Sequence, residues 1–154
     1  MSYVKRVLQP GETVVHVTWI HPIIFLPAIL WLIAALALLI GTLTALSGDP
    51  RIVGEALAAF CAIFALGSAI PALIRRISTE LAVTDRRVIY KSGLLARHTL
   101  EMNRSKVESV DVDQSLLGRL LGFGTIIVRG TGGSLEPIRV ISDPLTFRSH
   151  ITAG

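Results

Sequence analysis

The chain has 154 residues, of which 51% are hydrophobic and only 17% are charged. Its formal net charge of +4 is a mild excess, which suits an anionic membrane face better than a nucleic-acid surface, where basic residues cluster more densely. Its single cysteine, Cys61, excludes an intrachain disulfide and a cysteine-based metal site.

Residues 1–21 precede the first apolar run and are predicted to form a cytoplasmic N-terminal segment. Two apolar runs follow, residues 23–46 and 52–74, separated by a polar break at residues 47–51. A bilayer core of about 30 Å needs about 20 apolar residues in helical conformation, and each run exceeds that length. We therefore predict a transmembrane helical hairpin over residues 22–76, with spans at about 23–46 and 52–74.

The basic residues that flank the two spans predict their orientation. Lys5 and Arg6 precede the first span, and Arg75 and Arg76 follow the second, whereas the connecting loop carries one arginine and one aspartate. The positive-inside rule therefore places both termini in the cytoplasm. Trp19 is expected to be an interfacial anchor.

Small residues recur at four-residue spacing in both spans: Ala37, Gly41 and Ala45 in the first, and Gly54, Ala58 and Ala62 in the second. Such rows let helix backbones approach closely, so they indicate helix packing within the hairpin or between protomers; chance spacing in alanine-rich spans is the alternative. Glu55 is expected to suit the positive N-terminus of the second helix, with a proton-relay role as the alternative.

After Arg76 the helical pattern gives way to alternation typical of half-buried strands. Segments 79–83, 87–91, 98–104, 107–113, 125–129 and 135–141 predict about six strands in an antiparallel meander. Pro137, inside the last segment, favours an edge or bulged position. Asp143 and Pro144 predict the start of a closing helix over residues 145–151, with the aspartate as its N-cap.

A short leucine-rich helix is predicted between Ser115 and Gly122. Its four leucines fall on one face, with Arg119 opposite: Leu116, Leu117, Leu120 and Leu121. We expect this face to pack on the sheet and form part of the core, and insertion into lipid is the alternative.

Three stretches carry a resemblance to a known family: LAVTDRRVIY (residues 81–90), KVESVDV (106–112) and SLLGRLLGFGTI (115–126). Over residues 78–152 the chain resembles the bacterial PH-like domain family of membrane proteins. The resemblance implies a pleckstrin-homology-like fold, with two bent antiparallel sheets closed by a C-terminal helix. The expected fold class is thus an α+β membrane protein, with the PH-like domain at residues 77–154.

Five basic residues are candidate contacts for lipid headgroups: Arg75, Arg76, Arg86, Arg87 and Lys91. In the preferred structural interpretation, Asp85 instead caps a turn between two strands and the neighbouring arginines line an outer face of the domain. Eukaryotic PH domains bind phosphoinositides through a dense basic cluster, which is thin here, so that activity is not carried over.

No pattern in the chain indicates catalytic, metal or cofactor chemistry. The four histidines, His16, His21, His98 and His150, lack the spacing of metal ligands, and neither a P-loop nor a nucleophile elbow is present. The paired glycines after residue 121 and after residue 129 have the context of turns. We therefore expect a protein that is not an enzyme and needs no cofactor.

The expected function is that of a non-enzymatic, multi-pass protein of the bacterial inner membrane. Its domain is expected to bind an unidentified protein partner or to assemble with copies of itself, in contact with membrane lipid and without nucleic acid. Two alternatives stay open: an anionic-lipid-binding or membrane-stress module, and an accessory subunit of a transporter or membrane enzyme with Glu55 in its core.

Overall fold

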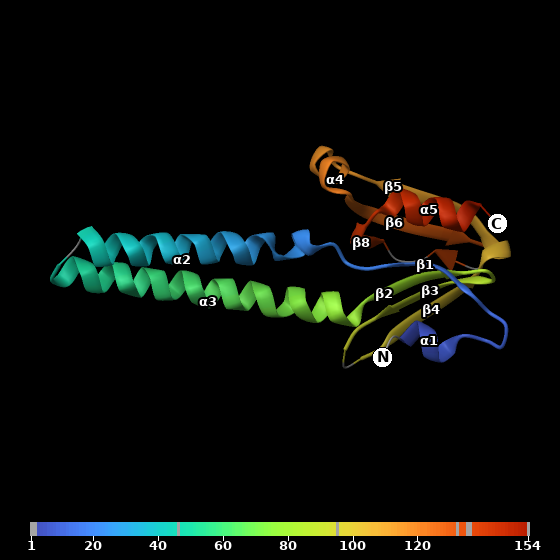
Figure 1. Cartoon of the computed structure of the whole chain (residues 1–154), viewed down its shortest axis with the longest axis horizontal. Helices are drawn as coiled ribbons and strands as arrows, with labels where there is room; N and C mark the ends of the chain where they lie inside the picture. Colours follow the sequence, from blue (N-terminus) through green and yellow to red (C-terminus); the bar gives the residue numbers. More distant parts are fainter. Residues whose placement is uncertain (1–2, 46, 95, 132, 135–136, 154) are drawn as a thin grey trace. The chain divides into compact units, whose positions relative to one another are not determined.

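The computed structural model describes residues 3–45, 47–94, 96–131, 133–134 and 137–153, and the chain forms two compact units (Figure 1). Residues 22–74 form a unit of apolar helices, and residues 1–21 join residues 75–154 in a second unit, called the domain below. The prediction of a separate N-terminal segment at residues 1–21 is thereby corrected, because these residues build part of the domain.

The domain holds two antiparallel sheets. The first has the order β1 (Val14–Thr18), β2 (Glu80–Thr84), β3 (Arg87–Ser92) and β4 (His98–Asn103). A 3-10 turn, η2 (Arg104–Lys106), leads to the second sheet. Its central strand β6 (Phe123–Gly130) pairs with β5 (Val107–Asp113), β7 (Gly133–Ser134) and β8 (Ile138–Ser142). The sequence predicted a single meander of about six strands and missed β1, whose partner β2 follows only after both apolar helices.

The C-terminal helix α5 (Pro144–Thr152) contacts strands of both sheets, namely β1, β2, β5 and β6. Its Phe147 is fully buried and Ile151 nearly so. At its C-terminal end, the Arg104 guanidinium donates to the carbonyls of His150 and Ile151, at 2.8 and 3.1 Å. The predicted closing helix is therefore present and held at its end by a side chain from η2.

A short N-terminal helix, α1 (Tyr3–Val7), covers part of the first sheet. Its Val4 packs against Ala82 and Ile89, and all three side chains are fully or almost fully buried. Because alternate residues of a strand face opposite sides, Leu81 and Val83 are buried on the other face. Strand β2 is thus buried on both faces, rather than half-buried as the alternation predicted.

The apolar unit begins with a 3-10 turn, η1 (Pro22–Phe25), and continues as α2 (Leu26–Ala45) and α3 (Asp49–Ser78). Both helices are long and apolar enough to cross a membrane, judged by length and composition alone. Helix α3 starts inside the predicted polar break, since Asp49 and Pro50 suit a first helical turn. Leu46, the predicted end of the first span, lies outside the described residues.

Two local predictions near the C-terminus are corrected. Pro137 precedes β8 rather than lying inside a strand, and the first residues of the predicted segment, 135 and 136, lie outside the described part of the chain. Pro144 opens α5 as predicted, but Asp143 adopts φ 46° and its side chain makes no capping hydrogen bond. Its backbone N–H donates instead to the carbonyl of Gly122, at 2.9 Å.

Candidate functional site

Arg87, one of the five candidate headgroup contacts, is committed to the interior of the domain. Its guanidinium donates to both carboxylate oxygens of Glu12, at 2.8 and 2.9 Å, and also to Glu101 and the carbonyl of Val7. The side chain of Glu12 is fully buried, and it accepts further bonds from the Thr84 hydroxyl and the Gln9 backbone N–H. Four donated hydrogen bonds of the Arg87 guanidinium are thus used inside the domain, which gives Arg87 a structural role and argues against its prediction as a headgroup contact.

The hydrogen bonds from Arg87 hold the pKa of Glu12 at about 2, well below its ordinary value, against the opposing effect of burial. In turn, the bond to Glu12 raises the pKa of Arg87. This pair joins the N-terminal segment, through Glu12, to β3, and so fastens residues 1–21 to the domain.

The other basic candidates fall at two ends of strand β2. Arg75 and Arg76 lie in the last turn of α3, just before β2, and Lys91 lies opposite Glu80 at the same end of the sheet. Arg86 lies in the turn after β2, and a strand of five residues at about 3.3 Å each separates it from that end. The structure therefore groups Arg75, Arg76 and Lys91, and does not bring all five residues together.

Both connections to the apolar helices reach the domain beside strand β8, at a region that we call the entry edge: Trp19, Ile20, His21 and the β8 residues 139–142. Ser142 donates its backbone N–H to the carbonyl of Trp19 at 2.9 Å, and His21 donates to the carbonyl of Val140 at 2.7 Å. Val140 adopts φ 63°, a conformation that a β-branched residue rarely takes, so β8 is bulged where it meets His21.

The second connection runs from the end of α3 into β2. There the guanidinium of Arg75 donates to the carbonyl of Arg139, at 3.0 Å. The chain therefore leaves the domain at His21 and re-enters it at Arg75 beside the same strand. Trp19 at this edge is 56% exposed.

The leucine-rich helix, α4 (Leu116–Leu121), presents its leucines to the exterior. Leu116 and Leu120 are 84% and 80% exposed, and Leu117 and Leu121 are also exposed. The prediction that this face belongs to the core is wrong. The buried residue of α4 is Gly118, which lies on the opposite side of the helix from the leucines.

Gly118 explains why the helix turns this way. A Cβ at Gly118 would lie 2.6 Å from the carbonyl oxygen of Phe123, so only glycine lets the helix backbone rest there. The Ser115 hydroxyl accepts the Gly118 N–H at 3.1 Å, and Gly122 closes the helix in the left-handed region at φ 75°. Helix α4 is thus held by caps and a backbone contact, without burial of its leucines.

Helices α2 and α3 bury small residues, but only one of the two predicted rows is among them. In α2 the buried residues are Ala28, Ala35 and Thr42, spaced by seven. Ala37, Gly41 and Ala45 are exposed on the far side of that helix, and a Cβ at Gly41 would meet no atom within 4 Å. In α3 the predicted row does pack, with Gly54 and Ala58 buried and Ala62 half-buried.

Glu55 forms an exposed ion pair with Arg51, one turn earlier in α3, at 2.8 Å. This is a common surface pairing at i,i+4 spacing. It explains the acid locally and gives no support to a proton relay.

Two histidines that are far apart in sequence meet in the domain, a contact that sequence spacing gave no signal for. His16 on β1 stacks on His150 of α5, with ring centroids 4.7 Å apart. Burial, and then the nearby His150, lower the pKa of His16, while Asp143 opposes that shift. Within the described residues, no group of three or more His, Cys, Asp or Glu side chains is placed to hold a metal ion.

Two antiparallel sheets closed by a C-terminal helix, with two long apolar helices inserted between β1 and β2, define an α+β protein with a small two-sheet domain. A sequence model described as Bacterial PH domain matches residues 13–153. The chain therefore belongs to the bacterial PH domain family, which confirms the resemblance. Comparison with curated proteins gives no match, and neither does comparison with solved structures.

Proposed function

We propose that this protein is a non-enzymatic membrane protein, in which α2 and α3 form a transmembrane hairpin that holds the PH-like domain at the cytoplasmic face of the bacterial inner membrane. The domain and hairpin serve assembly, either with further copies of the chain or with a protein partner. Family membership supports a module of the interaction or lipid-binding type.

The observation that carries the proposal is the outward position of the large apolar side chains on both helices. Leu36 and Ile40 of α2 and Ile63 and Leu66 of α3 are all at least half exposed, whereas small residues fill the buried positions. In water such a surface is costly to expose, but in a bilayer lipid tails cover it. An ordinary soluble core helix shows the opposite arrangement, with its large apolar residues inside.

The geometry favours assembly over the two alternative functions. The five basic residues do not gather into one phosphate site, and Arg87 is used internally, which weakens the case for headgroup recognition by a basic cluster. Glu55 pairs with Arg51 on an exposed surface, which weakens the case for a transport role. The exposed row on α2, in contrast, is a surface suited to close packing against another helix.

Topology is the first test. In a Cys61→Ala background, Ser47→Cys should react with a membrane-impermeant thiol reagent in intact cells, because the positive-inside rule places the α2–α3 connection outside. Ser47 is exposed, and it is preferred to Gly48, whose φ of 69° disfavours a side chain. Thr152→Cys should react only after the cells are lysed. Reaction at position 152 in intact cells contradicts the proposed orientation.

Self-association is the second test. Gly41→Leu should shift the detergent-solubilised protein toward monomer, because the leucine would hold apart two backbones that meet at the exposed row of α2. Gly67→Leu is the matched control: Gly67 lies in α3, outside the small-residue rows, and its Cβ position is equally open. The mass of the assembled particle is measured for wild type and for both variants, in mild detergent and in nanodiscs. A wild-type protein that is already monomeric in both media contradicts self-assembly.

A further inference from the structure

The four leucines of α4 form an exposed apolar face that does not contribute to the core of the domain. Four leucines are exposed on a six-residue helix that is capped at both ends and seated through Gly118. A soluble domain rarely exposes adjoining apolar side chains of this size without a partner. The question is what covers this face.

Helix α4 lies close to the entry edge of the domain. Directly after α4, the carbonyl of Gly122 accepts the Asp143 N–H, and Phe123 pairs in register with Ser142 of β8. The ring of Phe123 lies 5.3 Å from the ring of His21, the last residue before the apolar helices. Helix α4 is therefore fixed beside the entry edge, where both connections to the hairpin leave the domain.

Further side chains near this edge are of the kinds found at membrane interfaces. Leu145, at the start of α5, is exposed and lines the same small cavity as Arg119 of α4. Trp19 is exposed two residues before His21. Arg119 lies near Leu145 at that cavity, and residues 75–154 carry twelve Arg or Lys against eight Asp or Glu. Leucine and tryptophan with flanking cations match a bilayer with anionic headgroups.

We propose that the leucine face of α4 is a membrane-insertion surface, which places Leu116, Leu117, Leu120 and Leu121 in the headgroup–acyl boundary of the bilayer that holds the hairpin. This inference rests on the proposed function, because the bilayer comes within reach of α4 only if α2 and α3 span it. Insertion fixes the orientation of the domain on the membrane and leaves the opposite end of the domain free for a protein partner.

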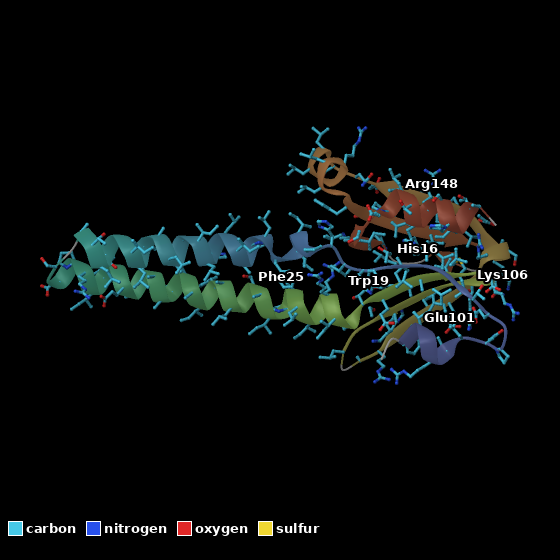
Figure 2. All side chains as sticks on the ribbon, viewed as in Figure 1. His16, Trp19, Phe25, Glu101, Lys106 and Arg148 are labelled. Carbon is cyan, nitrogen blue, oxygen red and sulfur yellow. The ribbon has the colours of Figure 1, made fainter. Side chains whose placement is uncertain are left out.

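The test uses the full chain in vesicles of phosphatidylethanolamine and phosphatidylglycerol. In a Cys61→Ala background, three single-cysteine variants carry an environment-sensitive fluorophore: Leu120→Cys on α4, Lys106→Cys as the domain control and Leu36→Cys in α2. Lys106 is exposed and precedes β5, whereas α4 follows β5, so the seven-residue strand separates the two labels (Figure 2). Quenching is compared between vesicles with brominated and with unbrominated acyl chains.

Fluorescence at position 120 should fall about twofold or more further than at position 106, because a side chain of an interfacial helix lies about 5–10 Å into the bilayer. Position 36 should be quenched in either case. Quenching at 36 without excess quenching at 120 overturns the insertion surface and leaves the hairpin intact. Absence of quenching at 36 overturns the proposed function itself. A label at 120 that is shielded from water but not quenched indicates a protein contact, and also overturns the inference.

Discussion

Replacing Arg87 with methionine is expected to destabilise the domain by about 3–5 kcal/mol, the usual cost of removing one partner from a buried ion pair. The reason is that the Glu12 carboxylate is fully buried and would lose the two guanidinium N–H donors that pair with it. The measurement is urea-induced unfolding of the full chain in mild detergent, read by the susceptibility of the domain to a protease pulse.

The neighbouring arginine supplies the control. Arg86 is half-exposed and lies 3.9 Å from Asp85, so Arg86→Met should change stability by no more than about 0.5 kcal/mol. The double variant Glu12→Gln with Arg87→Met should be more stable than Arg87→Met alone, because no unpaired charge is then buried. Equal unfolding midpoints for Arg86→Met and Arg87→Met contradict the role assigned to the ion pair.

The same pair predicts how acid acts on the domain. Because the pKa of Glu12 is lowered from 4.5 to about 2 by folding, the unfolded chain binds a proton more readily than the folded chain. The stabilisation is therefore complete above pH 4.5 and is lost as the pH falls from about 4.5 to about 2. Wild type should lose stability over this window more steeply than Glu12→Gln, in which that carboxyl is absent.

Truncating two apolar side chains, Phe147 and Leu120, is expected to give opposite results. Phe147→Ala should cost about 3–5 kcal/mol, since it empties a fully buried site between α5 and the sheets. Leu120→Ala should lie within about 0.5 kcal/mol of wild type, since its side chain is 80% exposed. The same urea and protease-pulse measurement compares them.

A large loss of stability for Leu120→Ala would restore the original prediction of a buried leucine face. In detergent the measurement reports packing within the domain, whereas the quenching experiment reports contact with lipid. The two experiments therefore address α4 independently of each other.

The candidate site was only partly accessible from sequence. The small-residue rows and the leucine periodicity were visible, but periodicity shows that residues share a helix face and not what that face meets. For α4, Gly118 decided the outcome, because its missing side chain allows contact with the Phe123 backbone on the side away from the leucines. For the basic residues, Glu12 determined which arginine is internal. Its buried carboxylate, far away in sequence, pairs with Arg87 and not with Arg86.

The sequence by itself determined the two apolar helices, most strands of residues 79–142, the closing helix and the family, because these depend on local periodicity, turn chemistry and specific motifs. Only the tertiary structure decided that residues 1–21 belong to the domain, since β1 pairs with β2 across both apolar helices. It also decided which face of α4 lies outside and which of the two small-residue rows, the one in α2 or the one in α3, is left unpacked. These outcomes depend on contacts between residues far apart in the chain, which local patterns do not encode.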